Sequence, residues 1–210
     1  MLHEIALGRE FLALLLKLDE AIAWAVASAG CRRCSGPLHR ADYARKPRGA
    51  RIIEGLESFA VRHSLCCARR GCRKRALPPS VRFLGQRVYV EPVVVLASMW
   101  AGTAPVGEAS EASGVPKWTL RRWSGWWRRE LPRLPAWLEL RARFAPPPPD
   151  EQTLPGSLVR RLGDDLAGGD APVPHEELVL LTARCLAPLT TRLPDGSRFM
   201  REIVERPSPS

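Results

Sequence analysis

Five of the six cysteines stand in two short groups whose spacing is typical of a structural metal site. Cys31 and Cys34 are separated by two arginines, and Cys66, Cys67 and Cys72 belong to the stretch CCARRGC. Structural Zn²⁺ sites take four thiolate or imidazole ligands, commonly supplied in pairs by two tight loops. The spacing therefore predicts one structural Zn²⁺, with Cys31, Cys34, Cys67 and Cys72 as its ligands.

The second group offers a choice of first ligand, because Cys66 and Cys67 are adjacent. The stretch from Cys67 to Cys72 closes a compact loop in which Gly71 can adopt a positive φ just before the last ligand. Cys67 is therefore favoured. Cys66 is expected to point away from the metal as a small apolar side chain.

Other chemistry for these residue types fits the sequence less well. Flanking arginines lower a thiol pKa and favour redox exchange, but a thioredoxin-like pair opens a helix, whereas Cys31 follows a predicted helix. His39 and His63 lie outside the ligand spacing and are expected to be ordinary strand residues. Cys185 stands alone in an apolar segment, so we assign it no nucleophilic role.

Residues 106–131 show the pattern of two helices joined by a sharp turn. Helices are predicted over 106–112 and 117–131, with Gly114 between them and a proline ending the second. An apolar residue follows the glycine, and others stand five and eight positions further on, where the second helix of a helix-turn-helix packs back on the first. Ser113 departs from this pattern, because a larger apolar residue usually precedes the turn.

The second of these helices has an apolar face and a basic face at about 100° per residue. The apolar face carries Leu120, Trp123, Trp127 and Leu131, and the opposite face carries Trp118, Arg121, Arg122, Gly125, Arg128 and Arg129. An ordinary exposed face intersperses acids, so the pattern favours DNA recognition over a merely arginine-rich surface. Gly125 would let a nucleic-acid backbone approach closely.

We therefore predict that this helix enters the DNA major groove. The first turns of a recognition helix usually meet base edges and the later turns meet phosphates. Arg121 and Arg122 are thus candidates for base contacts, and Arg128 and Arg129 for phosphate contacts. The complete set of candidate DNA-binding residues is Lys117, Trp118, Thr119, Arg121, Arg122, Arg128 and Arg129.

The composition supports a polyanionic partner. Of 210 residues, 32 are Lys or Arg and 22 are Asp or Glu, which gives a net charge of +10, and nearly all the cations are arginines. The planar arginine fork suits phosphate and guanine, so double-stranded DNA is the expected partner. No apolar stretch reaches the roughly 18 residues of a membrane span. We expect a cytoplasmic, nucleoid-associated protein without membrane contact, whose cysteines bind metal rather than form disulfides.

Four segments of an α+β chain must position these residues. Residues 1–30 are predicted to form an amphipathic helix, residues 31–90 a basic zinc-ribbon β module, and residues 91–145 a mainly helical helix-turn-helix domain. The module is rich in turns and poor in apolar residues, so we expect it to need the bound metal ion for a stable fold. Residues 146–210 are predicted to be a proline spacer and an acidic, partly helical tail, with exposed turns over 163–170. DNA binding is expected not to need this tail.

The order of the two modules resembles the front end of bacterial insertion-sequence transposases and their accessory proteins. The resemblance is carried by Cys31-x2-Cys34, by Cys67-x4-Cys72 with the basic stretch RKR after it, and by GVPKWTLRRW at 114–123. It covers about residues 31–143. In that family the zinc ribbon and helix-turn-helix bind the ends of the element, and a separate acidic domain cuts the DNA.

The resemblance implies DNA binding without catalysis. A metal-dependent strand-transfer domain needs three carboxylates on a large strand-rich fold, whereas about 60 residues follow the proline spacer. We therefore expect no enzymatic activity, and the resemblance admits a transposase as a partner. Two alternatives stay open: a host transcription regulator with the same modules, and a zinc-ribbon RNA-binding protein whose tryptophans stack on bases. Self-association is left open.

Overall fold

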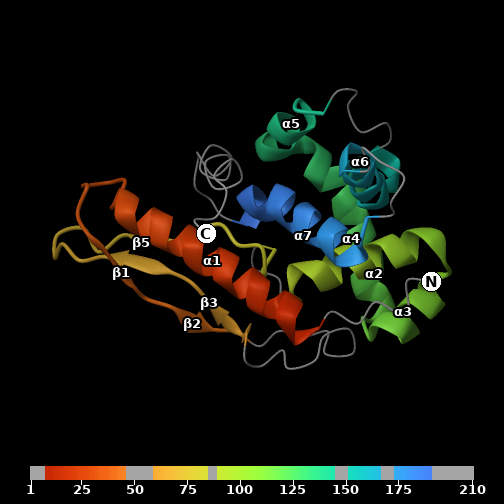
Figure 1. Ribbon diagram of the computed structural model, residues 1–210, viewed down its shortest axis with the longest axis horizontal. Coiled ribbons are helices and arrows are strands. Elements are labelled where there is room, and N and C mark those ends of the chain that lie inside the picture. Colours follow the sequence, from red (N-terminus) through yellow and green to blue (C-terminus); the bar gives the residue numbers. More distant parts are fainter. Residues whose placement is uncertain (1–7, 46–58, 85–88, 145–150, 167–172, 191–210) are drawn as a thin grey trace.

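A long first helix runs alongside both a helical part and a small β part of the chain (Figure 1). The structure is a computed structural model, and it describes residues 8–45, 59–84, 89–144, 151–166 and 173–190. Within these residues helices predominate and every strand pair is antiparallel. The predicted α+β class is confirmed in this coarse form.

The first helix, α1, spans Arg9–Ala29, as the three- and four-residue spacing of its apolar side chains predicts. It ends at Gly30, whose φ is 75° and whose N–H donates to the Ala27 carbonyl at 3.1 Å. The side chains on its inner face are Phe11, Leu12, Leu15, Asp19, Ile22, Ala23 and Val26. The inner face also carries one charged side chain, because Asp19 is buried. Conversely, one apolar side chain of the helix, Leu14, is 42% exposed.

The β part consists of two small antiparallel sheets. The first has the strand order β1 (Leu38–Arg40), β4 (Leu65–Cys67), β5 (Arg75–Ala76), and the second pairs β2 (Tyr43–Ala44) with β3 (Val61–Arg62). In the first sheet Leu38 lies opposite Cys67, and Cys66 lies opposite Arg75. Strands of two or three residues are too short to be stable alone.

A buried ion pair ties α1 to the segment that leaves the β part. The Asp19 carboxylate accepts hydrogen bonds from the Ser80 hydroxyl (2.6 Å), the Val81 N–H (2.7 Å) and the Arg82 Nε (2.8 Å). The same guanidinium donates to two backbone carbonyls at 2.6 and 2.8 Å. Asp19 and Arg82 are each only 1% exposed. Their buried charges are therefore compensated by each other and by additional hydrogen bonds.

The helical part is built around α2 (Glu91–Thr103), of which residues 91–98 are all buried. Helices α3 (Val106–Ser113) and α4 (Lys117–Gly125) both pack against it. The chain then continues as a π-helical turn (Trp126–Glu130), a 3₁₀ turn (Leu131–Arg133) and α5 (Pro135–Arg141). The helix predicted over 117–131 is thus right in extent, but its winding changes after Gly125.

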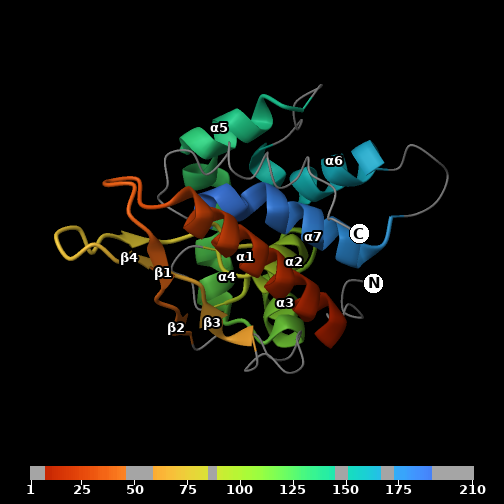
Figure 2. The same ribbon diagram turned by 60° about the vertical axis from the view of Figure 1, so that its left-hand side comes forward.

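The last two described helices, α6 (Gly156–Leu166) and α7 (His175–Leu186), belong to the same core as α2. α7 lies beside α2 and α6 in both views (Figures 1 and 2). The side chains that α6 and α7 contribute to this core are Leu158, Val159, Leu162, Val179, Ala183 and Leu186. The boundary predicted at residue 146 is therefore not a boundary of the hydrophobic core, and α6 and α7 are not a separate tail.

Where the structure describes the predicted turns over 163–170, it shows a helix instead, although the two acids there are exposed as predicted. Asp164 and Asp165 lie in α6. Asp165 forms an ion pair with Arg161 one turn earlier, with its Oδ1 2.9 Å from the arginine Nη2. The apolar side chains of α6 pack against α7. The acid-rich composition of this stretch does not by itself indicate that packing. The rest of that stretch and the prolines at 146–149 lie outside the described residues.

Candidate metal centre and basic helix

The first cysteine pair lies in a tight turn directly after α1. The N–H groups of Cys34 and Ser35 both donate to the Cys31 carbonyl, at 3.2 and 2.6 Å. Ser35 has a φ of 53°, which reverses the chain after the second cysteine. The Cys31 N–H in turn donates to the Gly36 carbonyl at 2.8 Å and closes the loop.

The second cysteine group repeats this turn between β4 and β5. The N–H groups of Cys72 and Arg73 both donate to the Arg69 carbonyl, at 3.0 and 3.1 Å, and Arg73 has a φ of 45°. The positive φ therefore follows the cysteine, whereas Gly71 was expected to carry it before the cysteine. Cys67 precedes the turn and lies in β4, so one ligand comes from the sheet and the other from the turn.

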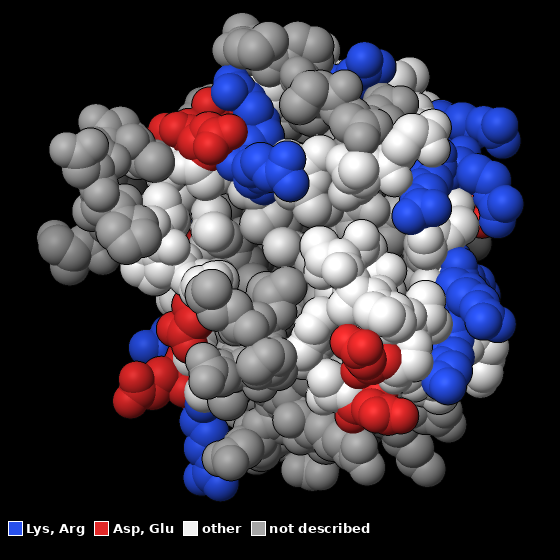
Figure 3. Space-filling view, turned by 90° about the vertical axis from the view of Figure 1, so that its right-hand side faces the viewer, with Lys and Arg blue, Asp and Glu red and all other residues white. Residues whose placement is uncertain are grey.

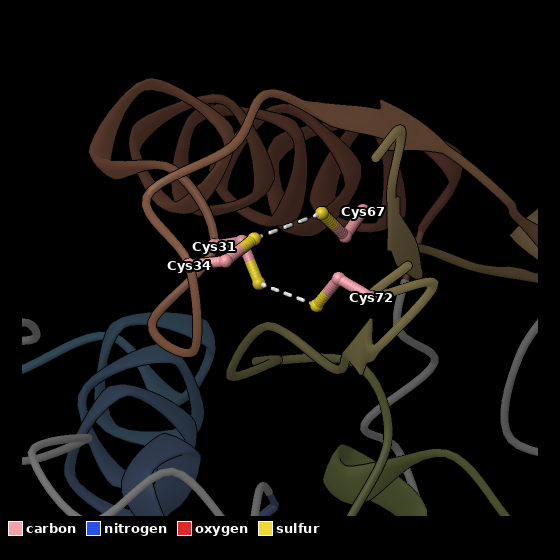
Figure 4. Close-up of side chains that lie close together, drawn as sticks. All are labelled: Cys31, Cys34, Cys67 and Cys72. Carbon is pink, nitrogen blue, oxygen red and sulfur yellow. Dashed lines mark hydrogen bonds between the residues drawn. The ribbon is translucent and has the colours of Figure 1, made fainter. Parts of the chain in front are cut away.

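The two turns bring four sulfurs together (Figure 4). The Sγ atoms of Cys31 and Cys72 are 3.7 Å apart, those of Cys34 and Cys67 are 3.5 Å apart, and all four lie within 4.8 Å of one another. Four sulfurs at about 2.3 Å from a central Zn²⁺ form a tetrahedron with edges of about 3.8 Å. All four cysteines are free thiols. Their number, chemistry and spacing fit a tetrahedral metal ion.

Cys31 and Cys67 have pKa values shifted in opposite directions. Hydrogen bonding from the backbone N–H of Arg33 lowers the pKa of Cys31 to about 7, while burial raises the pKa of Cys67 to about 12. A metal that binds the cluster must displace the protons that these thiols hold. Metal affinity is therefore expected to fall in acid.

Cys66 and the two histidines of the β part lie outside the cluster, as the sequence predicts. The Cys66 thiol points toward the Arg73 carbonyl at 3.5 Å, so Cys67 rather than Cys66 joins the four sulfurs. His39 belongs to β1. His63 is buried, with its Nδ1 3.1 Å from the Asp42 carboxylate.

Little apolar packing supports this centre. Its buried neighbours form a small cluster separate from the main core: Val26, Cys31, Leu38, Leu65 and Cys67. The Arg69 stem lies across Gly36, with its Cγ 2.9 Å from where a Cβ would be, and so packs one cysteine turn against the other. The apolar side chains buried around the four cysteines are therefore few.

The predicted turn between α3 and α4 is present. Gly114 adopts the left-handed conformation, with φ 67° and ψ 11°, and Val115 after it is fully buried. Ser113 occupies its buried position because its hydroxyl donates to the Ala109 carbonyl at 2.5 Å and accepts from the Val115 N–H at 3.2 Å. The departure from the usual apolar residue therefore leaves no polar group unsatisfied here.

The two predicted faces of 117–131 are also present. Leu120, Trp123, Trp127 and Leu131 are each at most 1% exposed. The side chains exposed to solvent are Lys117, Trp118, Arg121, Arg122, Arg128 and Arg129. Thr119 is a correction to the predicted DNA-binding set, because it is 1% exposed and lies in the core. The neighbouring Leu120 is buried as well. A threonine side chain is small enough to fit into the core beside it.

Gly125 does not offer the open approach that the sequence suggested. The Arg129 guanidinium folds across it, with Nη2 2.6 Å from where a Cβ would be. Gly125 thus makes room for an arginine of the same helix. A nucleic-acid backbone could reach this place only if Arg129 swung aside.

The basic helical face is not neutralised by neighbouring acids. Arg121, Arg122, Arg128 and Arg129 form no salt bridge with any residue that the structure describes. Figure 3 shows several lysines and arginines along one edge of the end of the molecule that carries the helical part, with acids nearer the middle of that face and further cations toward its other edge. This charge is free to meet an anionic partner.

No family model matches the chain, and neither a curated protein nor a solved structure matches it. Among the described helices, none has the length and apolarity that crossing a membrane requires. Residues and geometry, rather than relatives, therefore carry the functional assignment.

Proposed function

We propose that this chain is a non-catalytic, sequence-dependent binder of double-stranded DNA, with a structural Zn²⁺ in its four-cysteine centre. The observation that carries the proposal is the exposed row of Arg121, Arg122, Arg128 and Arg129 on a helix that buried tryptophans hold in place. A rigid helix with unpaired cations on one side is the element that a major groove accepts.

The packing around α4 supports a recognition role. α4 is held on its inner side by α2 and α3, and the sharp turn at Gly114 sets the angle between α3 and α4. Its outer side begins with Lys117 and Trp118, so the first turn presents side chains to solvent. The first turn of a recognition helix is the part that meets base edges.

The four-cysteine centre supports the zinc assignment and adds a second basic surface. Zn²⁺ is the metal that four thiolates in tetrahedral arrangement most commonly hold in proteins, and bound there it supplies folding energy. Arg32, Arg33, Arg69, Arg70 and Arg73 are exposed on the two cysteine turns. They are placed to contact phosphates without regard to sequence.

The order of the two modules further favours a role in a mobile element, in which the protein binds element ends and a transposase acts there. A host regulator would use the same surfaces at a different target site. RNA binding is less favoured, because Trp123 and Trp127 are buried in the core and cannot stack on bases, which leaves Trp118 as the exposed tryptophan of α4.

The test is a binding titration of the full-length, zinc-loaded protein on duplex DNA over a series of salt concentrations. Removing Arg128 and Arg129 together (Arg→Ala) should weaken binding to all duplexes and lower the salt slope by about two. Arg143→Ala with Arg160→Ala is the matched control, because both residues are exposed and lie outside the basic face. Equal losses in the two variants, or tighter binding of single-stranded RNA than of duplex DNA, would contradict the proposal.

A further inference from the structure

Trp118 is exposed where folding does not require it. Its indole is 61% exposed, and among the described large apolar side chains only Trp24 is more exposed. The buried side of α4 is made by Thr119, Leu120 and Trp123, so Trp118 contributes little to the core. An exposed large aromatic on an otherwise basic face is typical of a contact surface.

Arg122 lies one helical turn after Trp118 and is held over its ring. The guanidinium carbon is 5.1 Å from the ring centroid, which is cation–π geometry. The Arg122 side chain forms no hydrogen bond or ion pair with any described residue, so its guanidinium N–H groups remain available to a ligand. The tryptophan therefore restricts the arginine to one side of the helix before any ligand arrives.

This pair offers two kinds of contact that distinguish one DNA base from another. An arginine fork donates two hydrogen bonds to O6 and N7 of guanine, and a flat apolar surface contacts the 5-methyl group of thymine. Because the ring and the guanidinium are adjacent, the two bases that they contact must be neighbours along the groove.

We propose that Trp118 and Arg122 act as one specificity unit that recognises a guanine next to a thymine in the major groove. This inference rests on the proposed function. Arg122 reads the guanine, and Trp118 both positions Arg122 and contacts the thymine methyl group. Arg121 is exposed on the same helix and makes no cation–π contact with any ring that the structure describes, so it is not part of this unit.

The test begins by selecting the preferred duplex of the full-length, zinc-loaded protein from a random library. Two modified duplexes then probe the unit: 7-deazaguanine removes the N7 acceptor, and uracil in place of thymine removes the methyl group. The wild type should lose roughly tenfold in affinity with 7-deazaguanine and a smaller factor with uracil.

Trp118→Ala should reduce the discrimination against both modified bases, and Trp118→Phe should restore part of it. Arg143→Ala, at an exposed position outside the basic face, should leave it unchanged. The effects of Trp118→Ala and Arg122→Ala should be less than additive, because the two residues act together. Circular dichroism and zinc content check that each variant is folded.

The outcomes separate the two levels of the proposal. If the wild type binds no duplex DNA, the proposed function fails. If it binds with a preferred site that lacks a guanine beside a thymine, or if Trp118→Ala keeps full discrimination, the specificity unit fails while the DNA-binding function stands.

Discussion

The β part and the helical part of this protein are held together by different means. The β part has strands of two or three residues, and its small apolar cluster consists of Leu38, Leu65 and two of the four clustered cysteines, packed against Val26 of α1. The helical part buries Trp123, Trp127 and Trp137 almost completely around α2. A small segment that cannot bury enough apolar surface needs a covalent or metal staple, whereas a large helical core does not. Loss of metal should therefore affect the two parts unequally.

The largest expected effect comes from breaking the metal centre. Cys67→Ser should abolish stoichiometric zinc and unfold the β part, because a tetrahedral site with three thiolates binds metal far more weakly. Elemental analysis gives the zinc content, and circular dichroism and amide exchange show which part unfolds.

Cys66→Ser is the matched control, since Cys66 adjoins Cys67 but lies outside the cluster, and it should keep one zinc per chain. Equal zinc loss in both variants would contradict the ligand assignment. Unfolding of α2 and α7 along with the β part would contradict the proposed difference between the two parts.

The next-largest effect should come from breaking the buried ion pair that joins α1 to the segment leaving the β part. Asp19→Ala leaves the Arg82 guanidinium buried without its carboxylate, and breaking such a pair costs about 3–5 kcal/mol. Urea unfolding of the zinc-loaded protein measures the loss. Glu20→Ala, at the exposed neighbouring position, should change stability by only about 0.5 kcal/mol or less. A small loss for Asp19→Ala would show that this contact is not needed.

Leu186→Ala tests whether α7 belongs to the core. Leu186 is fully buried, and removing such a side chain should cost about 2–5 kcal/mol of unfolding free energy. Leu14→Ala changes the same residue type at a 42% exposed position and should cost much less. If Leu186→Ala unfolds like the wild type, α7 is the dispensable tail that the sequence suggested.

The last expected effect depends on pH and comes from Glu91, at the start of α2. Its side chain is buried and its two carboxylate oxygens have no hydrogen-bond partner among the described residues. Burial raises its pKa well above the ordinary value of 4.5, with Asp19 adding to the shift and Arg62 opposing it. The folded protein therefore holds a proton that the unfolded chain releases.

The stability from this proton is complete below pH 4.5 and falls as the pH rises toward the raised value. Glu91→Gln mimics the protonated form, so its advantage over the wild type should grow with pH in this window, by at most about 1.4 kcal/mol per pH unit. Urea unfolding at several pH values measures the difference. Parallel stability curves for the two proteins would rule out a titrating, buried Glu91.

Much of the local structure follows from residue spacing alone. The extent of α1, the turn at Gly114 and the buried stripe of Leu120, Trp123 and Trp127 could all be predicted, because neighbouring residues set helical periodicity and turn conformation. The contact between the two cysteine pairs joins residues 41 and 33 positions apart, but the spacing within each pair could be predicted for the same reason. These features depend on residues that are close in the chain.

Burial between distant segments was decided only by the tertiary structure. The sequence suggests that Asp19 is a surface acid, but Ser80 and Arg82 bind it in the interior. It likewise suggests that Thr119 is exposed, but Thr119 is buried. Composition also assigned α6 and α7 to an acidic tail, although their few apolar residues suffice to join the core. The pairing of Trp118 with Arg122 depends on side-chain conformation as well as spacing. Each of these outcomes depends on which surfaces meet in three dimensions, and periodicity within one segment does not encode that.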